Sequence, residues 1–151
     1  MLVGDGASLQ ALRFDKGGNS VRPQPDWLRR NAAFVTVKKQ LDAYFAGQLT
    51  RFSVALSPQG TDFQQRVWQA LQDIPYGETC SYLDIASTLE DPNATRAVGA
   101  ANGKNPIPII IPCHRVIGRD GSLTGFGGGL ERKRFLLALE QENIPFELTG
   151  L

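Results

Sequence analysis

The run Ile109-Ile110-Ile111-Pro112-Cys113-His114-Arg115-Val116 constrains this chain more than any other stretch. Three β-branched apolar residues predict a strand, and the proline after them predicts its end. A cysteine and the only histidine of the sequence follow directly. Because a thiolate is a strong nucleophile and histidine can activate it, the pair is a candidate catalytic centre. For a bare Cys-His pair, the alternative is a buried structural cysteine beside a surface histidine.

The composition indicates a globular protein with enough length for one sizeable domain or two small ones. The chain has 151 residues, of which 42% are hydrophobic. No apolar run approaches the roughly 20 residues of a membrane span, and the N-terminus lacks the pattern of a signal peptide. Two cysteines do not make a disulfide framework, and one histidine without Cys-x-x-Cys spacing argues against a zinc site. We therefore expect a cytoplasmic protein with no metal and no cofactor.

The residue pattern changes near residue 58. Residues 1–58 carry a net charge of +4 and residues 59–151 a net charge of −3, so the total of +1 gives no general signature of nucleic-acid binding. The first part reads as a small α/β unit, with a strand over 9–14, a loop over 17–26, a helix over 34–45 and a half-buried strand over 52–56. We expect a domain boundary between residues 58 and 59.

The second part, residues 59–151, is predicted to be mostly helical. Thr61 begins one helix with a capping box, and Ser81 precedes a second helix over 82–89. Asn93 is expected to cap a third helix over 94–102, and a last helix is expected over 130–143 after the glycine-rich loop 125–129. The second and third helices have the proportions of a helix-turn-helix pair. Such pairs also occur in proteins that never bind DNA, so the proportions alone leave the function open.

Several motifs together resemble the O6-alkylguanine-DNA alkyltransferases (methylated-DNA–protein-cysteine methyltransferases). They are Pro75-Tyr76-Gly77-Glu78, Ser81-Tyr82, Arg96-Ala97-Val98-Gly99, Asn105-Pro106, Ile111-Pro112-Cys113-His114-Arg115-Val116, Gly128-Gly129-Leu130 and Glu140. Their order and spacing match over residues 59–151, and residues 28–58 match more loosely. The resemblance implies an α+β fold in which a small ribonuclease H-like α/β domain, 1–58, without its first strand precedes a mostly helical domain, 59–151, with a helix-turn-helix.

The resemblance also implies direct DNA repair by a protein that reacts once. The alkyl group of O6-alkylguanine, or less well of O4-alkylthymine, moves irreversibly to Cys113 after the base is rotated out of the duplex. Neighbouring side chains of an extended strand point to opposite faces, so His114 is expected to reach the thiol through a water molecule or after a bend at Pro112. The family's water relay agrees with this geometry.

Glu140 completes the predicted catalytic chain by orienting His114. Its position between Leu136 and Leu137 on the apolar side of the last helix independently predicts a buried partner for its carboxylate. The resemblance implies that Asn105 ties the helix-turn-helix to the active-site segment. Lys133 matches a lysine of the family, without a role that the sequence assigns.

The expected DNA contacts lie on the helix-turn-helix, which the resemblance places in the minor groove of double-stranded DNA with Arg96 filling the gap left by the flipped base. Small residues on the second helix favour close approach to a groove about 6 Å wide. The DNA-binding set is Tyr82, Ala94, Thr95, Arg96, Ala97, Ala100 and Arg115. The base-pocket set is Tyr82, Ile111, Phe126, Gly127 and Gly128. Gly127 stands where the family often has serine, which favours reading of the base by backbone groups.

Three other functions stay open at this point. An alkyltransferase-like binder that only flags lesions shares the fold, but such proteins replace the nucleophile that Cys113 provides here. A helix-turn-helix regulator leaves His114 and Glu140 without a purpose, and a cysteine hydrolase would turn over many times. We expect a monomer that acts on alkylated double-stranded DNA and does not bind membranes.

Overall fold

A two-stranded antiparallel hairpin begins the described part of the chain, which covers residues 1–14 and 22–145 of this computed structural model. Strand β1 (Leu2–Gly4) pairs with β2 (Leu9–Leu12), with Leu2 opposite Leu12. The predicted first strand is therefore confirmed. The predicted strand over 52–56 is wrong, because only Leu56 forms a bridge to Leu9. Phe52 instead turns its ring toward Tyr44, with the ring centres 5.4 Å apart.

Helix α1 (Val35–Phe45) follows a short 3-10 helix over Asn31–Phe34 and confirms the helix predicted over 34–45. Its residues Val37 and Tyr44 are buried. The predicted loop over 17–26 falls partly outside the described residues, and residues 22–26 contain neither helix nor strand. The N-terminal part thus places one amphipathic helix beside a small hairpin, and Tyr44 near the end of that helix faces the rest of the molecule.

Two capping boxes fix the first helices of the C-terminal part. In α2 (Asp62–Gln72) the Thr61 hydroxyl accepts from the Gln64 amide N–H, and the Gln64 side chain accepts from the Thr61 N–H. After the short strand β3 (Cys80–Ser81), Ser81 and Asp84 cap α3 (Tyr82–Thr88) in the same way. Both N-termini lie where the sequence predicts them, because each cap satisfies amide donors that a helix start leaves free.

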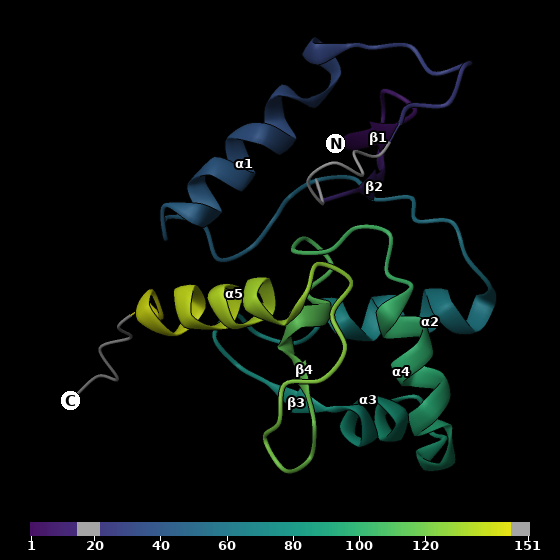
Figure 1. Cartoon of the computed structure of the whole chain (residues 1–151), viewed down its shortest axis with the longest axis vertical. Helices are drawn as coiled ribbons and strands as arrows, with labels where there is room; N and C mark the ends of the chain where they lie inside the picture. The colour runs from purple at the N-terminus through teal and green to yellow at the C-terminus, as the bar shows by residue number, and fades with distance from the viewer. Residues whose placement is uncertain (15–21, 146–151) are drawn as a thin grey trace.

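Helix α4 (Thr95–Gly103) packs against α3 and completes the helix-turn-helix pair, which Figure 1 shows at the edge of the molecule away from α1. The predicted Asn93 cap is wrong. Asp91 accepts a 3.2 Å hydrogen bond from the Asn93 N–H and begins a 3-10 helix over Pro92–Ala94, from which α4 continues. Proline suits the first turn of a helix because it has no N–H to satisfy there, and so the cap moves to the residue before it.

The segment before Cys113 is not a strand, contrary to the prediction from its three isoleucines. Ile109 has a φ of 76°, and the Ile111 N–H donates to the Ile107 carbonyl in a tight turn. Prolines at 106, 108 and 112 supply no ladder donors, which explains why the run does not pair along its length. A 3-10 helix over Cys113–Arg115 follows, so the chain bends directly after Pro112.

Strand β4 (Val116–Ile117) continues from this bend and pairs in parallel with β3, Cys80 lying opposite Val116. The last helix, α5 (Leu130–Glu142), lies below α1 in Figure 1, on the side of the view away from α2 and α4. One hydrophobic core joins the two parts of the chain, with Leu9, Leu12 and Val37 packed into the same cluster as Val67, Trp68 and Leu71. Among the described residues, no helix has both the length and the apolarity needed to cross a membrane.

Candidate active site

The Cys113 thiol borders a cavity of about 280 Å³ that separates the active-site segment from the glycine-rich loop. Cys113 is 4% exposed, and Phe126, Gly127 and Gly128 form the opposite wall. The wall is tight, because a Cβ atom added at Gly128 would lie 2.7 Å from the Phe126 ring and 2.8 Å from the Phe14 ring. The sequence-predicted nucleophile and three of the five predicted base-pocket residues therefore meet around one cavity.

The other two predicted pocket residues lie elsewhere. Ile111 is fully buried in the core and does not line the cavity, which corrects its assignment to the base pocket. Its carbonyl accepts a 2.8 Å hydrogen bond from the Asn105 side chain. Tyr82 is half-buried at the start of α3 and does not border the cavity, but its hydroxyl donates to the Thr124 carbonyl in the loop that carries Phe126. Tyr82 thus joins the helix-turn-helix to the cavity wall.

Burial governs the state of the Cys113 thiol. It raises the thiol pKa, although the Asn105 side chain and the positive charge of Lys133 act in the opposite direction. The thiol is therefore the resting form near neutral pH, and a base must take its proton before the sulfur can act as a strong nucleophile. Lys133 is itself fully buried, and its ammonium donates to the carbonyls of Val116 and Thr124.

His114 is placed to be that base. It has no exposed surface, and its Nε2 lies 2.7 Å from Glu140 Oε1. Burial lowers the His114 pKa, and the hydrogen bond and charge of Glu140 oppose this only in part. The ring is therefore neutral near pH 7, which is the form that accepts a proton. Its other nitrogen, Nδ1, is buried and has no hydrogen-bond partner among the described residues.

Glu140 accepts hydrogen bonds from four different residues. Besides His114, its oxygens accept from the Tyr44 hydroxyl at 2.7 Å, the Gly77 amide at 3.2 Å, and Arg115 Nε and Nη2 at 2.9 and 3.0 Å. Burial alone would raise the carboxyl pKa, but the hydrogen bonds and charges of His114 and Arg115 hold it at about 2. Gly77 has a φ of 78°, and a side chain there would press on Ile144, so glycine brings the amide close to the carboxylate.

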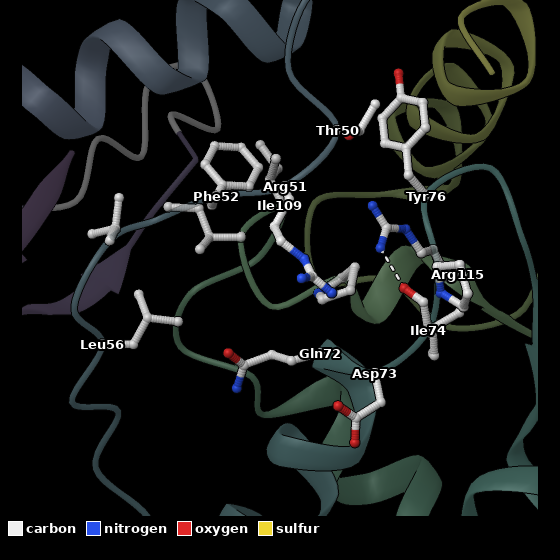
Figure 2. A pocket seen from close by; sticks show the side chains of 14 residues that line it. Thr50, Arg51, Phe52, Leu56, Gln72, Asp73, Ile74, Tyr76, Ile109 and Arg115 are labelled. Atoms are coloured by element: carbon white, nitrogen blue, oxygen red, sulfur yellow. Dashed lines mark hydrogen bonds between the residues drawn. The ribbon is translucent and has the colours of Figure 1, made fainter. Parts of the chain in front are cut away.

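Arg115 is the clearest correction to the sequence-based assignments. It was expected to contact DNA, but it is 6% exposed and ion-paired to Glu140. Figure 2 shows its guanidinium turned toward the carbonyl of Ile74, which accepts from Nη1 at 2.6 Å. The cavity of about 380 Å³ in that view borders Arg115 and Tyr76 but not the thiol. All three guanidinium nitrogens of Arg115 donate to Glu140 or to the Ile74 carbonyl inside the protein. The side chain therefore belongs to the Glu140 network and does not extend to a DNA phosphate.

Tyr44 is the functional residue that the sequence analysis missed. It comes from α1 in the N-terminal part, has no exposed surface, and is 96 residues away in sequence from the carboxylate it contacts. Tyr44 follows Leu41 at helical spacing, and this pattern predicts only that Tyr44 is a residue of the hydrophobic core. No short-range pattern in the sequence marks a tyrosine whose hydroxyl reaches a distant helix.

Asn105 has the bracing geometry that the sequence predicts. Immediately after α4 it donates through Nδ2 to the Ile111 carbonyl at 2.8 Å and accepts through Oδ1 from the Ile107 N–H at 2.9 Å. These bonds tie the end of the second helix of the pair to the turn that precedes Cys113. The side chain thereby helps to fix the thiol relative to the helix-turn-helix.

The predicted DNA-contacting residues of the helix-turn-helix lie at its surface. Arg96, Ala97 and Ala100 are exposed on α4, and Ala94 and Thr95 are partly exposed at its start. The Arg96 guanidinium has no hydrogen bond or ion pair to any residue that the structure describes, so the side chain is available to a partner. Within residues 1–14 and 22–145 no group of three or more His, Cys, Asp or Glu side chains is arranged to hold a metal ion.

Comparisons with known proteins point to one family over nearly the whole chain. Residues 1–58 match the ribonuclease-like domain of 6-O-methylguanine DNA methyltransferase, and residues 62–142 match its DNA-binding domain. A methylated-DNA–protein-cysteine methyltransferase of Methanosarcina barkeri is 51% identical over 144 residues, covering 95% of this chain and 91% of that protein.

Solved structures agree with the sequence match. The crystal structure of the Mycobacterium tuberculosis O6-methylguanine methyltransferase superposes with a TM-score of 0.88 at 54% identity, covering 98% of this chain and 89% of that one. A Mycobacterium tuberculosis structure described as OGT in complex with DNA gives a TM-score of 0.87 at 54% identity and covers 97% and 89% of the two chains.

Proposed function

The chain belongs to the 6-O-methylguanine DNA methyltransferase family, so it binds DNA and repairs it by alkyl transfer to a cysteine of the protein, and we propose that Cys113 is that cysteine. One observation carries the proposal. Cys113 borders a cavity, the next residue, His114, is hydrogen-bonded through Nε2 to Glu140, and His114 Nδ1 has no hydrogen-bond partner among the described residues. Cys80 lacks such neighbours, and burial and Asp84 raise its pKa to about 11.

The reaction is a displacement at the alkyl carbon. His114 Nδ1 takes the thiol proton, through one water molecule if the two atoms are not in direct contact, and Glu140 stabilises the imidazolium that forms. The Cys113 sulfur then bonds to the alkyl carbon as the bond from that carbon to O6 breaks. The electron pair of that bond returns to the base, and the proton from the thiol ends on guanine N1. The products are S-alkylcysteine and unmodified guanine.

The arrangement predicts one turnover. Water would have to displace the Cys113 thiolate from an unactivated alkyl carbon of a thioether, and a base such as His114 does not make that carbon electrophilic. The alkylated protein cannot return to the thiol by the same chemistry, so the transfer is irreversible and stoichiometric. This separates the proposed function from a cysteine hydrolase, whose acyl intermediate water removes.

The DNA surface is proposed to be the helix-turn-helix of α3 and α4, placed in the minor groove. The side chains of Ala94, directly before α4, and of Thr95, Ala97 and Ala100 on α4 are short, which suits close approach to a narrow groove. The exposed Arg96 side chain would fill the space left by the rotated base. Rotation is required because the cavity beside Cys113 lies inside the protein, and a stacked base cannot reach it.

The rotated base is proposed to enter the cavity between Cys113 and the Phe126–Gly128 wall. Phe126 offers an aromatic face for stacking, and the bare backbone at Gly127 allows the base to approach closely. Tyr82 would act at the junction of this wall and the helix-turn-helix, through its bond to Thr124. O6-alkylguanine is the preferred substrate in this proposal, O4-alkylthymine a poorer one, and the protein acts as a monomer.

A stoichiometry experiment tests the proposed function. Increasing amounts of a duplex with one O6-methylguanine are mixed with a fixed amount of protein, and restored guanine is counted. We expect a plateau at one guanine per protein molecule, with no restoration by Cys113→Ala and full restoration by Cys80→Ala. Continued turnover would contradict a suicide mechanism. Lesion binding without restoration by the unmodified protein would indicate a protein that only flags the damage.

A further inference from the structure

One charged side chain borders the cavity beside Cys113, and the alkyl transfer described above gives it no role. Among the described residues that line this cavity, only Arg13 is charged. It comes from the N-terminal part of the chain, directly after strand β2, and it is exposed. Its guanidinium forms no hydrogen bond or ion pair to a described residue, so its N–H donors are available to a ligand.

Arg13 lies where the cavity opens to solvent. The exposed residues among the described lining are Arg13, Gly103 and Gly127, whereas Cys113 is 4% exposed. Gly103 is the last residue of α4, the helix proposed to lie in the minor groove. The opening is therefore bordered both by the N-terminal part and by the end of the proposed DNA-binding helix.

Two contacts hold Arg13 at this opening. The N–H of the preceding residue, Leu12, donates at 2.9 Å to the carbonyl of Pro106, in the segment that leads to Cys113. The Arg13 guanidinium lies 5.8 Å from the centre of the Trp27 ring, within the range of a cation–π contact. The side chain is thus ordered before a ligand arrives, which lowers the entropy lost on binding.

A rotated nucleotide brings negative charge to the opening of the cavity. The base stays attached to its sugar, which carries a phosphate on each side, so a base that enters the cavity leaves two phosphates outside it. Each phosphodiester has one negative charge, and the planar guanidinium of arginine can donate two parallel hydrogen bonds to such a group. We infer that Arg13 binds a backbone phosphate next to the rotated nucleotide, so that the N-terminal part takes a direct part in DNA binding.

This inference rests on the proposed function and adds a DNA contact outside the helix-turn-helix. The flanking phosphates reach the opening only when the nucleotide rotates, because they move with the sugar to which the base is attached. Arg13 therefore favours the rotated state over the stacked one. It should matter for alkyl transfer from a lesion and not for binding of an undamaged, stacked duplex.

The experiment measures how methyl transfer depends on salt. A duplex with one O6-methylguanine reacts with excess protein below saturation, and the second-order rate constant is compared for the unmodified protein, Arg13→Gln and Arg13→Lys. One phosphate contact contributes about 0.9 to the slope of log affinity against log salt concentration. Arg13→Gln should therefore react more slowly, and the advantage of the unmodified protein should shrink about 3.5-fold between about 50 and 200 mM salt. Arg13→Lys keeps the charge and should keep the slope.

Lys38→Gln provides a matched control. Lys38 is an exposed cation of α1 in the same N-terminal part, and it does not line the cavity. This variant loses the same charge as Arg13→Gln, but its salt slope should equal that of the unmodified protein. Titration with an undamaged duplex of the same sequence is a second control, and Arg13→Gln should bind that duplex as tightly as the unmodified protein does.

An unchanged salt slope in Arg13→Gln would overturn the inference whatever the loss of rate, because a side chain that only packs on Trp27 releases no counterions from DNA. An equal change of slope in Lys38→Gln would also overturn it, since net charge and not a contact would then set the slope. So would a loss of affinity of Arg13→Gln for the undamaged duplex that equals its loss of rate, because the contact would then be made to stacked DNA. Absence of transfer by the unmodified protein contradicts the proposed function itself, and the inference falls with it.

Discussion

Replacing Tyr44 by phenylalanine removes one hydroxyl from the Glu140 network and leaves the ring in place. The hydroxyl donates at 2.7 Å to Glu140 Oε1, and both groups are fully buried. A hydrogen bond to a charged acceptor contributes about 1.5–3 kcal/mol to stability. Because Gly77, His114 and Arg115 still donate to the carboxylate, we expect the lower end of this range, about 1.5–2 kcal/mol. For a chain of this size that corresponds to a fall of roughly 3–8 °C in Tm.

Tyr76 provides a matched control. Its hydroxyl is also buried but has no hydrogen-bond partner among the described residues, and its ring packs 6.1 Å from that of Tyr44. Tyr76→Phe removes an unsatisfied polar group, so stability should be unchanged or slightly higher. Both variants are compared with the unmodified protein by thermal unfolding. Equal Tm changes in the two variants would refute the reasoning.

Tyr44→Phe should also change the pH dependence of methyl transfer. With one donor fewer, the negative charge of Glu140 is less dispersed and stabilises the His114 imidazolium more strongly. The His114 pKa, which burial holds below 6.5, should rise. Since the neutral ring is the base, the rate falls as pH drops through that pKa, and the fall should begin at a higher pH in Tyr44→Phe. Identical acid limbs in Tyr44→Phe and the unmodified protein would show that the tyrosine does not act through His114.

Three further outcomes follow from the same contacts. Arg115→Met should lower the free energy of unfolding by about 3–5 kcal/mol because it breaks a buried ion pair. Arg96→Ala should instead leave Tm unchanged and weaken DNA binding, with a smaller dependence of the affinity on salt. Thermal unfolding and DNA titrations at several salt concentrations check both variants, and the reverse pattern would show that Arg115 contacts DNA. The free energy of unfolding should decrease as pH falls from about 4.5 toward 2, because the Glu140 pKa is about 2 in the folded protein and 4.5 ordinarily, so the unfolded chain takes up the proton first. Urea unfolding at each pH measures this decrease, and an equal decrease in Glu140→Gln would contradict the assignment to Glu140. Gly128→Ala should slow methyl transfer while DNA affinity stays the same, because the added Cβ meets the Phe126 and Phe14 rings; equal single-turnover rates would show that the cavity wall yields.

Local chemistry explains which parts of the fold the sequence predicts. The helix starts at Thr61 and Ser81 follow from side chains that bond amides three residues away, and both capping boxes are present. The burial of Glu140 follows from its place on the apolar side of α5. Each of these features depends on neighbours within one or two helical turns, and short-range patterns record such neighbours well.

The parts that the sequence missed depend on distant partners. Three isoleucines before Pro112 have strand propensity, but the prolines around them leave too few donors for a ladder, and the segment forms a turn. The sequence motif predicts that Arg115 contacts DNA, because it does not show that Arg115 forms an ion pair with Glu140 of the distant helix α5. The partner of Tyr44 is likewise set by packing of α1 against α5, which no local pattern contains.

Intact-protein mass spectrometry with peptide mapping tests the central claim most directly. The unmodified protein is incubated with a duplex containing one O6-methylguanine, digested, and examined at the two cysteine peptides. Cys80 serves as the internal control, because it is half-buried and outside the cavity. The account predicts the mass of one methyl group on the peptide containing Cys113 and none on the peptide containing Cys80. A methyl group on Cys80, or none on either cysteine while guanine is restored, would contradict it.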